Sequence, residues 1–356
     1  MLENRITNTS RVTLIKNNNN DILVVNSARV SFDKESMLDE NGNLLPADQG
    51  LLNYLASHKH FTPFTHIRET FAFNEEWFDI DWFIQSCTQE NLAGINMAKA
   101  NVYDSPSWVI RHSFFGWVKL LELNETENIF QPCVAEYIKE VLCSRYPGSM
   151  KAYNLYSESF EIDGAGDYVT FLPTIDMFVE SDSENNPGVY DKPVIEFYDE
   201  SRRDYFIDFT VREEVPFAIA RQRFKHMVGF TYNEVSRRYV STPPEYYVPE
   251  IFRGRAENKK QGSMNTPCDN HKLVKDMYIN SITELDSLYD ALVQVKGEFN
   301  TCPEQARFII PMGTMTSYYV TGNLNSWKRA VSERLNPHAQ LEIQEWACQV
   351  KTLLGI

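Results

Sequence analysis

The chain has 356 residues, a formal net charge of −15 and 43% apolar residues, which suits one large or two ordinary globular domains with a substantial core. The acidic balance excludes sequence-independent binding to nucleic acid or to a membrane surface, because both need a broad basic face.

The first residues of the chain contain no basic stretch that leads into an apolar signal core, and no run approaches about 18 apolar residues. We therefore expect a soluble protein of the cytoplasm. Six cysteines are scattered along the sequence without any Cys-x-x-Cys spacing. This pattern predicts buried free thiols rather than a disulfide framework or a zinc site.

The N-terminal part alternates short apolar runs with polar turns. After a low-complexity loop at 17–20, residues 22–25 have the apolar run of a short buried strand. A helix is predicted over 49–57, where apolar residues recur on one side. Apolar and polar residues then alternate over 67–73, which predicts a half-buried strand.

Residues 75–204 differ in composition from the sequence on either side. Their first half is aromatic with helical spacing, and their second half is acidic and rich in loop residues, notably at 180–188. We interpret this segment as an insertion at one end of a sheet, bracketed by two strands that pair with each other, because surface connections tolerate added length. The glycines at 164–166 lack the third glycine of a dinucleotide loop.

Positive charge gathers in the sequence that follows. Residues 205–211 alternate as a strand, and Pro216 suits the first turn of a helix that runs to residue 225. In an acidic protein, a local cationic cluster favours a site for phosphate or carboxylate, because arginine forks bind these anions well. A solvated basic helix face is an equally good interpretation of the spacing alone. The cluster consists of Arg221, Arg223, Lys225, Arg237 and Arg238.

The C-terminal third is the most regular part of the chain. Apolar residues recur at helical spacing over 274–292, which predicts a long amphipathic helix packed on the core. Thr301 and Glu304 form a capping-box pattern, which predicts a short helix that carries Arg307 in its second turn.

A final helix is predicted to begin at Asn336 and Pro337. Arg334 would lie just outside its N-terminus, where free N–H groups and the helix dipole reinforce anion binding. An arginine on a surface turn is the alternative from the spacing alone. The inward face of this helix is predicted to be Ile343, Trp346, Ala347, Val350 and Leu354.

Five segments of the sequence form an ordered set. They are 28–32 (ARVSF), 60–66 (HFTPFTH), 220–239 with Asn-Glu-x-Ser-x-Arg inside it, 306–311 (ARFIIP) and 338–344 (HAQLEIQ). In this order they resemble the flavin-dependent thymidylate synthase family. The resemblance covers about residues 20–74 and 205–354. It implies a catalytic domain of residues 1–74 and 205–356, and an α+β fold with a central, mostly antiparallel sheet and flanking helices.

The resemblance also implies an activity and an assembly. The activity is reductive methylation of dUMP to dTMP, with methylenetetrahydrofolate as carbon donor, NADPH as reductant and FAD as hydride carrier. The assembly is a homotetramer with shared active sites, in which Arg307 arrives from a neighbouring chain. We expect Arg334 to be the catalytic residue, because a fixed cation beside N3 and O4 of uracil would stabilise negative charge on the ring.

The resemblance assigns contacts residue by residue. The residues implied to contact dUMP are Gln222, Glu234, Ser236, Arg237, Arg238, Arg307 and Arg334. The residues implied to contact FAD are His60, Thr62, Lys225, His226, Glu234, Asn323, Asn325, Arg329 and His338.

The sequence departs from the family pattern at its flavin-binding triplet. The usual Arg-His-Arg, followed by seven residues and Ser, stands here as Lys225-His226-Met227, followed by eight residues and Ser236. Lysine can meet a phosphate as a point charge but lacks the bidentate fork, and methionine can only pack. Arg329 stands where Asn is common, and we expect it to offset the missing cation near FAD.

Two other candidate sites are weaker. His58, His60 and His66 could suggest a metal site, but no carboxylate pair accompanies them at a fitting spacing, so no metal is expected. Pro132-Cys133 resembles the nucleophile of the cysteine-dependent thymidylate synthases, yet its surroundings lack the activating residues, and we expect a core residue. Two hypotheses remain, an active flavin-dependent methyltransferase or a catalytically weak relative that binds nucleotide or serves in assembly.

Overall fold

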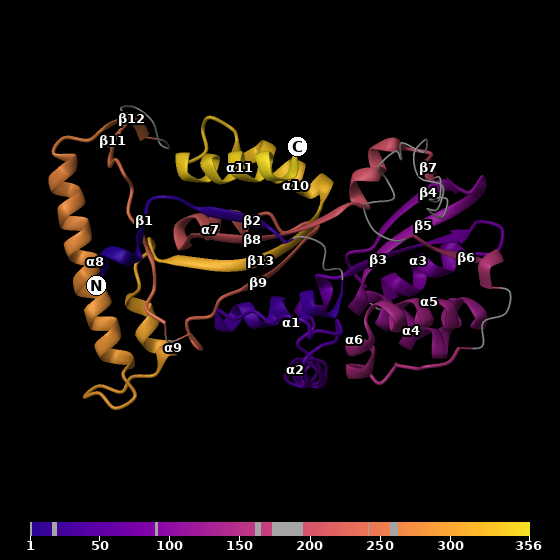
Figure 1. Ribbon diagram of the computed structural model, residues 1–356. Helices are drawn as coiled ribbons and strands as arrows, with labels where there is room; N and C mark the ends of the chain where they lie inside the picture. The colour runs from indigo at the N-terminus through magenta and orange to yellow at the C-terminus, as the bar shows by residue number, and fades with distance from the viewer. Residues whose placement is uncertain are drawn as a thin grey trace.

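The structure is a computed structural model that describes residues 2–15, 20–89, 92–160, 165–172, 195–240, 242–256 and 263–356. Two antiparallel sheets lie side by side along the molecule, and helices flank both of them (Figure 1). The predicted α+β fold with mostly antiparallel sheets is therefore confirmed. The predicted loop at 180–188 and most of the loop at 17–20 lie outside the described residues.

The first sheet has the strand order β2-β8-β13-β9. Its central strand β13 is buried along its whole length, because helices cover both faces of the sheet there. Side chains alternate along it, so that Tyr318 and Val320 pack on one face and Tyr319 on the other. The four strands are β2 (Arg11–Leu14), β8 (Asp208–Pro216), β9 (Phe230–Glu234) and β13 (Met315–Asn323).

Three helices form one hydrophobic core with the first sheet. Trp327 and Trp346 are completely buried in it, against Val211 and Val215 of β8. In Figure 1, α10 and α11 lie above the sheet. The helices are α7 (Phe217–Arg223), α10 (Leu324–Arg334) and α11 (Leu341–Leu354).

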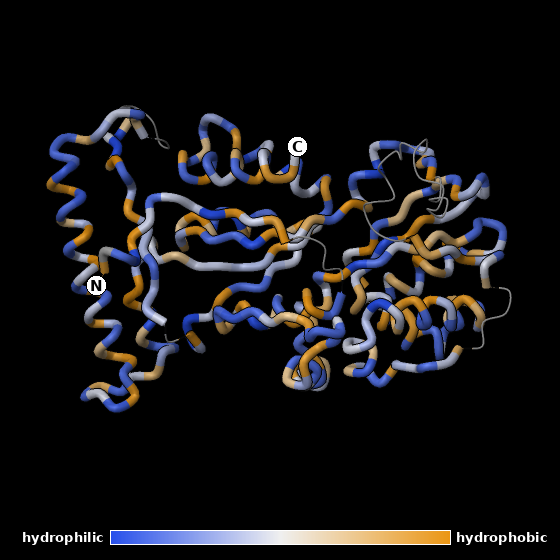
Figure 2. Tube along the Cα trace, in the orientation of Figure 1, coloured by the Kyte–Doolittle hydropathy of each residue, from blue (hydrophilic) through white to orange (hydrophobic). Residues whose placement is uncertain are grey.

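The second sheet has the strand order β6-β3-β5-β4-β7 and lies at the other end of the molecule. Its strands are β3 (Arg68–Asn74), β4 (Asn96–Val102), β5 (Ser105–Ser113), β6 (Val169–Leu172) and β7 (Ile195–Phe197). Its helices are α3 (Ile80–Gln89), α4 (Phe114–Glu127), α5 (Pro132–Arg145) and α6 (Pro147–Ala152). Hydrophobic residues are frequent in this part of the chain (Figure 2).

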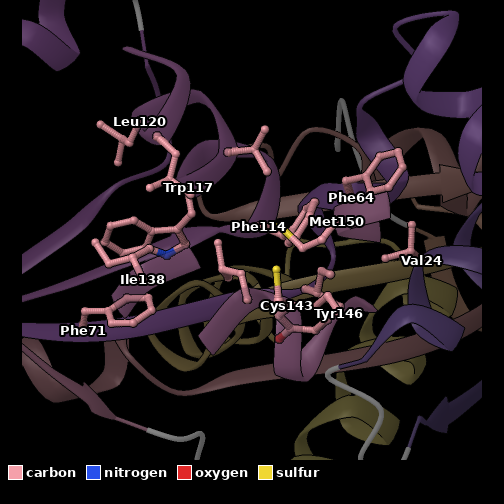
Figure 3. Close-up of a cluster of buried hydrophobic side chains, with 14 of the residues drawn as sticks. Val24, Phe64, Phe71, Phe114, Trp117, Leu120, Ile138, Cys143, Tyr146 and Met150 are labelled. Carbon is pink, nitrogen blue, oxygen red and sulfur yellow. The ribbon is translucent and has the colours of Figure 1, made fainter. Parts of the chain in front are cut away.

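The largest core joins the second sheet to the N-terminal helices. Figure 3 shows Phe71 of β3 beside Trp117 of α4, with Val24 and Phe64 at the far side of the same cluster. Cys133 packs against this core, as predicted. The N-terminal helices are α1 (Asp21–Arg29) and α2 (Pro46–Ser57), so the predicted helix over 49–57 is confirmed.

Two predictions about the N-terminal part and the segment 75–204 are wrong. Residues 22–25 form the buried middle of α1 rather than a strand, and Asn20 caps this helix by accepting from the backbone N–H of Ile22 at 3.1 Å. The strands that bracket 75–204 do not pair. Instead β3 lies between β5 and β6, and β8 lies between β2 and β13.

A long helix stands at the opposite end of the molecule from the second sheet. This helix, α8 (His271–Val293), confirms the predicted amphipathic helix (Figure 1). Ile282 and Tyr289 are buried as expected, whereas Leu288 is 45% exposed. Within the described residues, no helix is both long and apolar enough to cross a membrane.

Short elements complete the described chain. β1 (Ile6–Thr7) pairs in parallel with β10 (Tyr246–Tyr247), and β11 (Arg253–Arg255) pairs with β12 (Ser263–Pro267). The short helices are η1 (Leu2–Arg5), η2 (Val30–Phe32), η3 (Thr62–Thr65), η4 (Ala165–Asp167), η6 (Glu200–Tyr205), α9 (Pro303–Ala306) and η7 (Arg307–Ile309).

Candidate active site

The loop between α7 and β9 is clamped to the start of α10. The backbone carbonyl of Val228 accepts from the hydroxyl of Ser326 at 3.1 Å and from the guanidinium of Arg329 at 2.9 Å. Asn323 caps α10 by accepting from the N–H of Ser326. Gly229 has φ +80°, and a Cβ there would lie 2.0 Å from Ser326 Oγ, so only glycine lets the loop approach α10 this closely.

Arg334 is held by neighbours on α7 and on the loop that follows it. Its Nε donates to Nε2 of His226 at 2.8 Å, and its Nη2 donates to the carbonyl of Gln222 at 3.1 Å. Burial and the nearby Arg223 and Arg334 lower the pKa of His226 to about 4, so the ring is neutral at neutral pH. Because Nε2 accepts, the ring proton lies on Nδ1, 3.6 Å from Glu333 Oε2.

The position predicted for Arg334, just outside the N-terminus of the final helix, is wrong. Arg334 is the last residue of α10, and the final helix α11 begins at Leu341 with Gln340 at its N-cap, not at Asn336. The Asn336 side chain instead accepts from the N–H of His338 within a turn. The rest of the prediction for α11 is confirmed, because Ile343, Trp346, Ala347 and Val350 are buried, and Leu354 is half-buried.

Arg334 opens onto a cleft of about 800 Å³, which we call the Arg334 cleft. Among the described residues, Arg334 has no carboxylate within ion-pair distance, whereas Arg253 in the same cleft is paired with Glu342 at 2.7 Å. A cation without an acidic partner suits an anionic or electron-rich ligand. The cleft is lined by Gln222, Arg253, Ser263, Asn265, Arg334, Pro337, His338, Ala339, Gln340, Leu341 and Gln344.

Four other residues predicted to contact dUMP gather at the far end of β9. Ser236 Oγ lies 3.4 Å from the Nε of Arg238, whose guanidinium is also 3.4 Å from Glu304. Burial raises the pKa of Glu234, while a hydrogen bond from Thr316 at 2.8 Å and the charge of Arg307 act in the opposite direction.

Ser31 supports this second group and was given no role by the sequence. Its hydroxyl donates to the carbonyl of Glu234 at 3.2 Å, and its carbonyl accepts from the N–H of Ser236 at 3.0 Å. The sequence did contain a signal for Ser31, because this residue lies in the ARVSF segment, one of the five ordered segments. These two hydrogen bonds join the ARVSF segment directly to the Asn-Glu-x-Ser-x-Arg segment.

The capping box predicted before Arg307 is wrong. Cys302 is at the N-cap of α9 without a side-chain hydrogen bond, and the Thr301 hydroxyl donates instead to the carbonyl of Phe299. Arg307 begins the short helix η7 and is half-buried. It lies within electrostatic reach of Glu234 of its own chain.

The five cations of the basic cluster do not form one strip. Arg223 is completely buried and pairs with Glu213 at 3.1 Å, so its inclusion in an anion site is wrong. Arg237 donates to the carbonyl of Thr242, and burial lowers its pKa. Arg221 and Lys225 are exposed.

A second cleft, of about 580 Å³, lies beside the loop 227–229, and we call it the Arg329 cleft. It contains three of the residues predicted to contact FAD, namely Asn323, Asn325 and Arg329. Its polar donors are side-chain amides, guanidinium groups and hydroxyls. It is lined by Thr65, Arg68, Ala93, Gly94, Ile95, Asn96, His112, Ser113, Tyr205, Met227, Val228, Gly229, Phe230, Thr231, Asn323, Asn325, Ser326 and Arg329.

The histidine-rich segment 60–66 borders the same region. His60 and Thr62 are exposed, and Thr65 of η3 donates to Thr231 Oγ1 at 3.2 Å. His66 is buried, with Nδ1 at 2.7 Å from Thr321 Oγ1 and Nε2 at 3.0 Å from Asn233 Oδ1. Both ring nitrogens are therefore used in hydrogen bonds inside the protein. Among the described residues, no group of three His, Cys, Asp or Glu side chains is arranged to hold a metal ion.

Comparisons with known proteins show that the chain is similar to thymidylate synthases. Residues 205–355 match the family described as Thy1, thymidylate synthase complementing protein. The flavin-dependent thymidylate synthase of Aquifex aeolicus is 29% identical over 94% of each chain. That of Thermosipho africanus is 31% identical over 41% of this chain and 63% of its own length. Because the first alignment covers 94% of this chain, the resemblance also extends into 75–204.

A solved structure is similar at a lower level. The UMP/dUMP methylase PolB from Streptomyces cacaoi, bound with 5-Br UMP, is 14% identical. The superposition covers 99% of this chain and 91% of that chain, with a TM-score of 0.41, which is too low to support a conclusion. The resemblance inferred from the five ordered segments is confirmed by the sequence relatives.

Proposed function

We propose that this chain, a relative of the flavin-dependent thymidylate synthases, converts dUMP to dTMP by reductive methylation. The uracil C5–H is lost as a proton, methylenetetrahydrofolate supplies the carbon, and NADPH supplies the hydride, so that tetrahydrofolate and NADP⁺ are released. The observation that carries the proposal is Arg334, which two neighbours orient onto a cleft without an acidic partner among the described residues.

Arg334 would act on the uracil ring. A guanidinium beside N3 and O4 stabilises the negative charge that makes C5 nucleophilic, as donors do in an oxyanion hole. His226 accepts from Nε and Gln222 accepts from Nη2, so the Nη1 end of the fork remains for the substrate. Because His226 is neutral, it orients Arg334 without competing for the developing negative charge.

The group at the far end of β9 would bind the phosphate of dUMP. Arg238 and Arg307 provide two guanidinium forks, and Ser236 adds a hydroxyl donor. Glu234, whose pKa is raised by burial, interacts electrostatically with Arg307 and accepts a hydrogen bond from Thr316. In this arrangement Ser31 is a positioning residue, because it touches the backbone on both sides of Val235.

The Arg329 cleft would hold part of FAD. Asn323, Asn325 and Arg329 supply amide and guanidinium donors, and the loop 227–229 forms another part of the lining. This donor set suits a dinucleotide, which is rich in oxygen and nitrogen acceptors. FAD, when bound, carries the hydride from NADPH to the one-carbon unit.

The residues expected to contact dUMP form two separate groups, one at the Arg334 cleft and one at the far end of β9, and this separation supports an assembly with shared sites. Gln222 and Arg334 are hydrogen-bonded to each other on α7 and α10, whereas Ser236 and Arg238 follow the end of β9 beside Glu304. Each set is held by its own neighbours. A single dUMP would reach both more easily if a second copy of the chain completed the site, as in the expected homotetramer.

The test begins with purified protein. We expect a flavin absorbance band, or its appearance on addition of FAD, and release of the C5 hydrogen of dUMP that depends on NADPH and methylenetetrahydrofolate. Protein that binds dUMP but neither binds FAD nor releases this hydrogen would instead support the nucleotide-binding or assembly function. The exposed Lys225 and Met227, which replace the two arginines of the family triplet, are the features that favour this second function.

A further inference from the structure

The Arg329 cleft has two walls that come from different parts of the chain. One wall is the loop 227–229 with the start of α10. The other is formed by Ile95, Asn96, His112, Ser113 and Tyr205. Four of these five residues belong to the segment 75–204, for which the ordered segments suggested no role.

The second wall is firmly attached to the first sheet. Asp208, the first residue of β8, is paired with Arg111 of β5 at 2.6 Å and with Arg68 of β3 at 3.2 Å, and all three side chains are nearly buried. At the cleft itself, Asn96 Nδ2 donates to the carbonyl of Tyr205 at 3.1 Å. The two walls therefore keep a fixed relation to each other.

His112 is the unusual member of this wall. It is 3% exposed, and within the described chain neither ring nitrogen has a hydrogen-bond partner. Burial lowers its pKa to about 3, so the ring is neutral and offers one donor and one acceptor. An unsatisfied buried polar group costs about 1–3 kcal/mol, which a phenylalanine would avoid.

The fold also makes room for this ring. Gly116, in the first turn of α4, lies against it, and a Cβ there would be 1.9 Å from His112 Nε2. The Nε2 edge of the imidazole therefore packs against the start of α4, and Nδ1 is the ring nitrogen that remains for a ligand. A histidine in such a position on a cleft wall points to a partner that comes from a ligand.

We propose that His112 is a positioning residue that hydrogen-bonds the flavin dinucleotide in the Arg329 cleft, so that the segment 75–204 takes part directly in cofactor binding. This inference rests on the proposed function. A neutral imidazole can donate to, or accept from, the nitrogen and oxygen atoms of a flavin without adding charge. Arg329 on the opposite wall supplies the positive charge.

The test compares variants at His112 by titration of FAD, followed through flavin fluorescence. His112→Phe keeps the ring volume and removes both nitrogens, and we expect about tenfold weaker binding, the effect of one lost hydrogen bond. His112→Gln keeps a donor and an acceptor, and we expect it to restore most of the affinity. The matched control is Tyr153→Phe, which removes another unpartnered buried polar atom away from the cleft and should leave affinity unchanged.

A measurement on the unmodified protein covers the case in which His112→Phe does not fold. The ¹⁵N signals of the His112 ring should shift on addition of FAD. Unchanged signals, or a folded His112→Phe protein that binds FAD as tightly as the wild type, would overturn the inference while leaving the proposed function in place. A wild-type protein that does not bind FAD would overturn both.

Discussion

At the scale of single residues, Arg334 is held in place by its neighbours rather than by an acidic partner. His226 and Gln222 fix two of its donor atoms, and the part of the chain that the structure describes provides no carboxylate to neutralise it. A cation kept in this way is available to a ligand, whereas Arg253 in the same cleft is already paired with Glu342. The two arginines therefore make a matched pair for mutation.

Arg334→Ala is expected to lower kcat by about 10²- to 10³-fold, which corresponds to about 2.7–4 kcal/mol of transition-state stabilisation. The measurement is release of the C5 hydrogen of dUMP at saturating substrate. Arg253→Ala is the control, and it should have a much smaller effect. Turnover at the wild-type rate in Arg334→Ala would remove the role assigned to this residue.

Arg329 has both a structural contact and a predicted cofactor contact. It donates to the carbonyl of Val228 and lines the Arg329 cleft, so it can compensate for the arginine that Met227 replaces. We expect Arg329→Asn to weaken FAD binding several-fold in a fluorescence titration. Lys328→Asn, which removes the neighbouring exposed cation paired with Asp204, is the control. Equal FAD affinity in Arg329→Asn and the wild type would refute the compensation.

At the scale of elements, the loop 226–229 and the start of α10 form one unit. The backbone of the loop accepts from two α10 side chains, and Gly229 adopts a left-handed conformation at the point of closest approach. Both clefts depend on this unit, because His226 at one end orients Arg334 and Gly229 at the other lines the Arg329 cleft.

Gly229→Ala should therefore destabilise the protein by about 1–3 kcal/mol and weaken FAD binding as well. The physical reason is the positive φ together with the 2.0 Å approach to Ser326 Oγ. Thermal unfolding with and without FAD measures both effects. Gly166→Ala is the control, since no atom lies within 4 Å of the Cβ that it adds. Similar melting temperatures for the two variants would contradict this account of the loop.

At the scale of the whole molecule, the two sheets are joined by a small number of buried charges. Asp208 pairs with an arginine from each of two strands of the second sheet, and the pKa of its carboxyl is lowered, although burial alone would raise it. Replacing it removes the carboxylate that both guanidinium groups share in a nearly buried place. Such changes are costly, because the desolvation of the remaining charges is no longer offset.

We expect Asp208→Asn to lower the free energy of unfolding by about 3 kcal/mol in urea. Glu214→Gln, which weakens a more exposed pair with Arg11, should cost less than about 1 kcal/mol. If the two variants unfold at the same urea concentration, the buried pairs do not hold the sheets together.

Buried histidines should make stability depend on pH. His66 and His112 have pKa values lowered to about 3 by burial, so between pH 6.5 and about 4 the unfolded chain binds more protons than the folded chain. The stability that each neutral, buried histidine contributes is therefore fully present above pH 6.5. Below that pH the free energy of unfolding falls, by up to about 1.4 kcal/mol per pH unit for each histidine. His112→Phe should reduce this slope in urea unfolding measured between pH 7 and pH 5. A slope equal to that of the wild type would argue against this assignment.

The sequence by itself determined the family resemblance, the α+β class, the helix over 49–57, the long helix α8 and the inward face of α11. These features are local patterns or ordered segments, which survive without knowledge of what packs against them. The sequence also predicted that Glu234, Ser236 and Arg238 lie close together, because they are near neighbours in one strand and the turn that follows it.

Only the tertiary structure decided the rest. Residues 22–25 form a helix because a four-residue apolar run suits either element until its neighbours are known. Arg223 is buried because Glu213 and aromatic rings surround it, and Arg334 is oriented by a histidine 108 positions away. The same holds for His112, which lines the cleft because buried ion pairs join the first sheet to a second sheet whose strands all lie between β2 and β8 in the sequence. Contacts between residues so far apart leave no periodic trace in the sequence, since each depends on how separate elements pack.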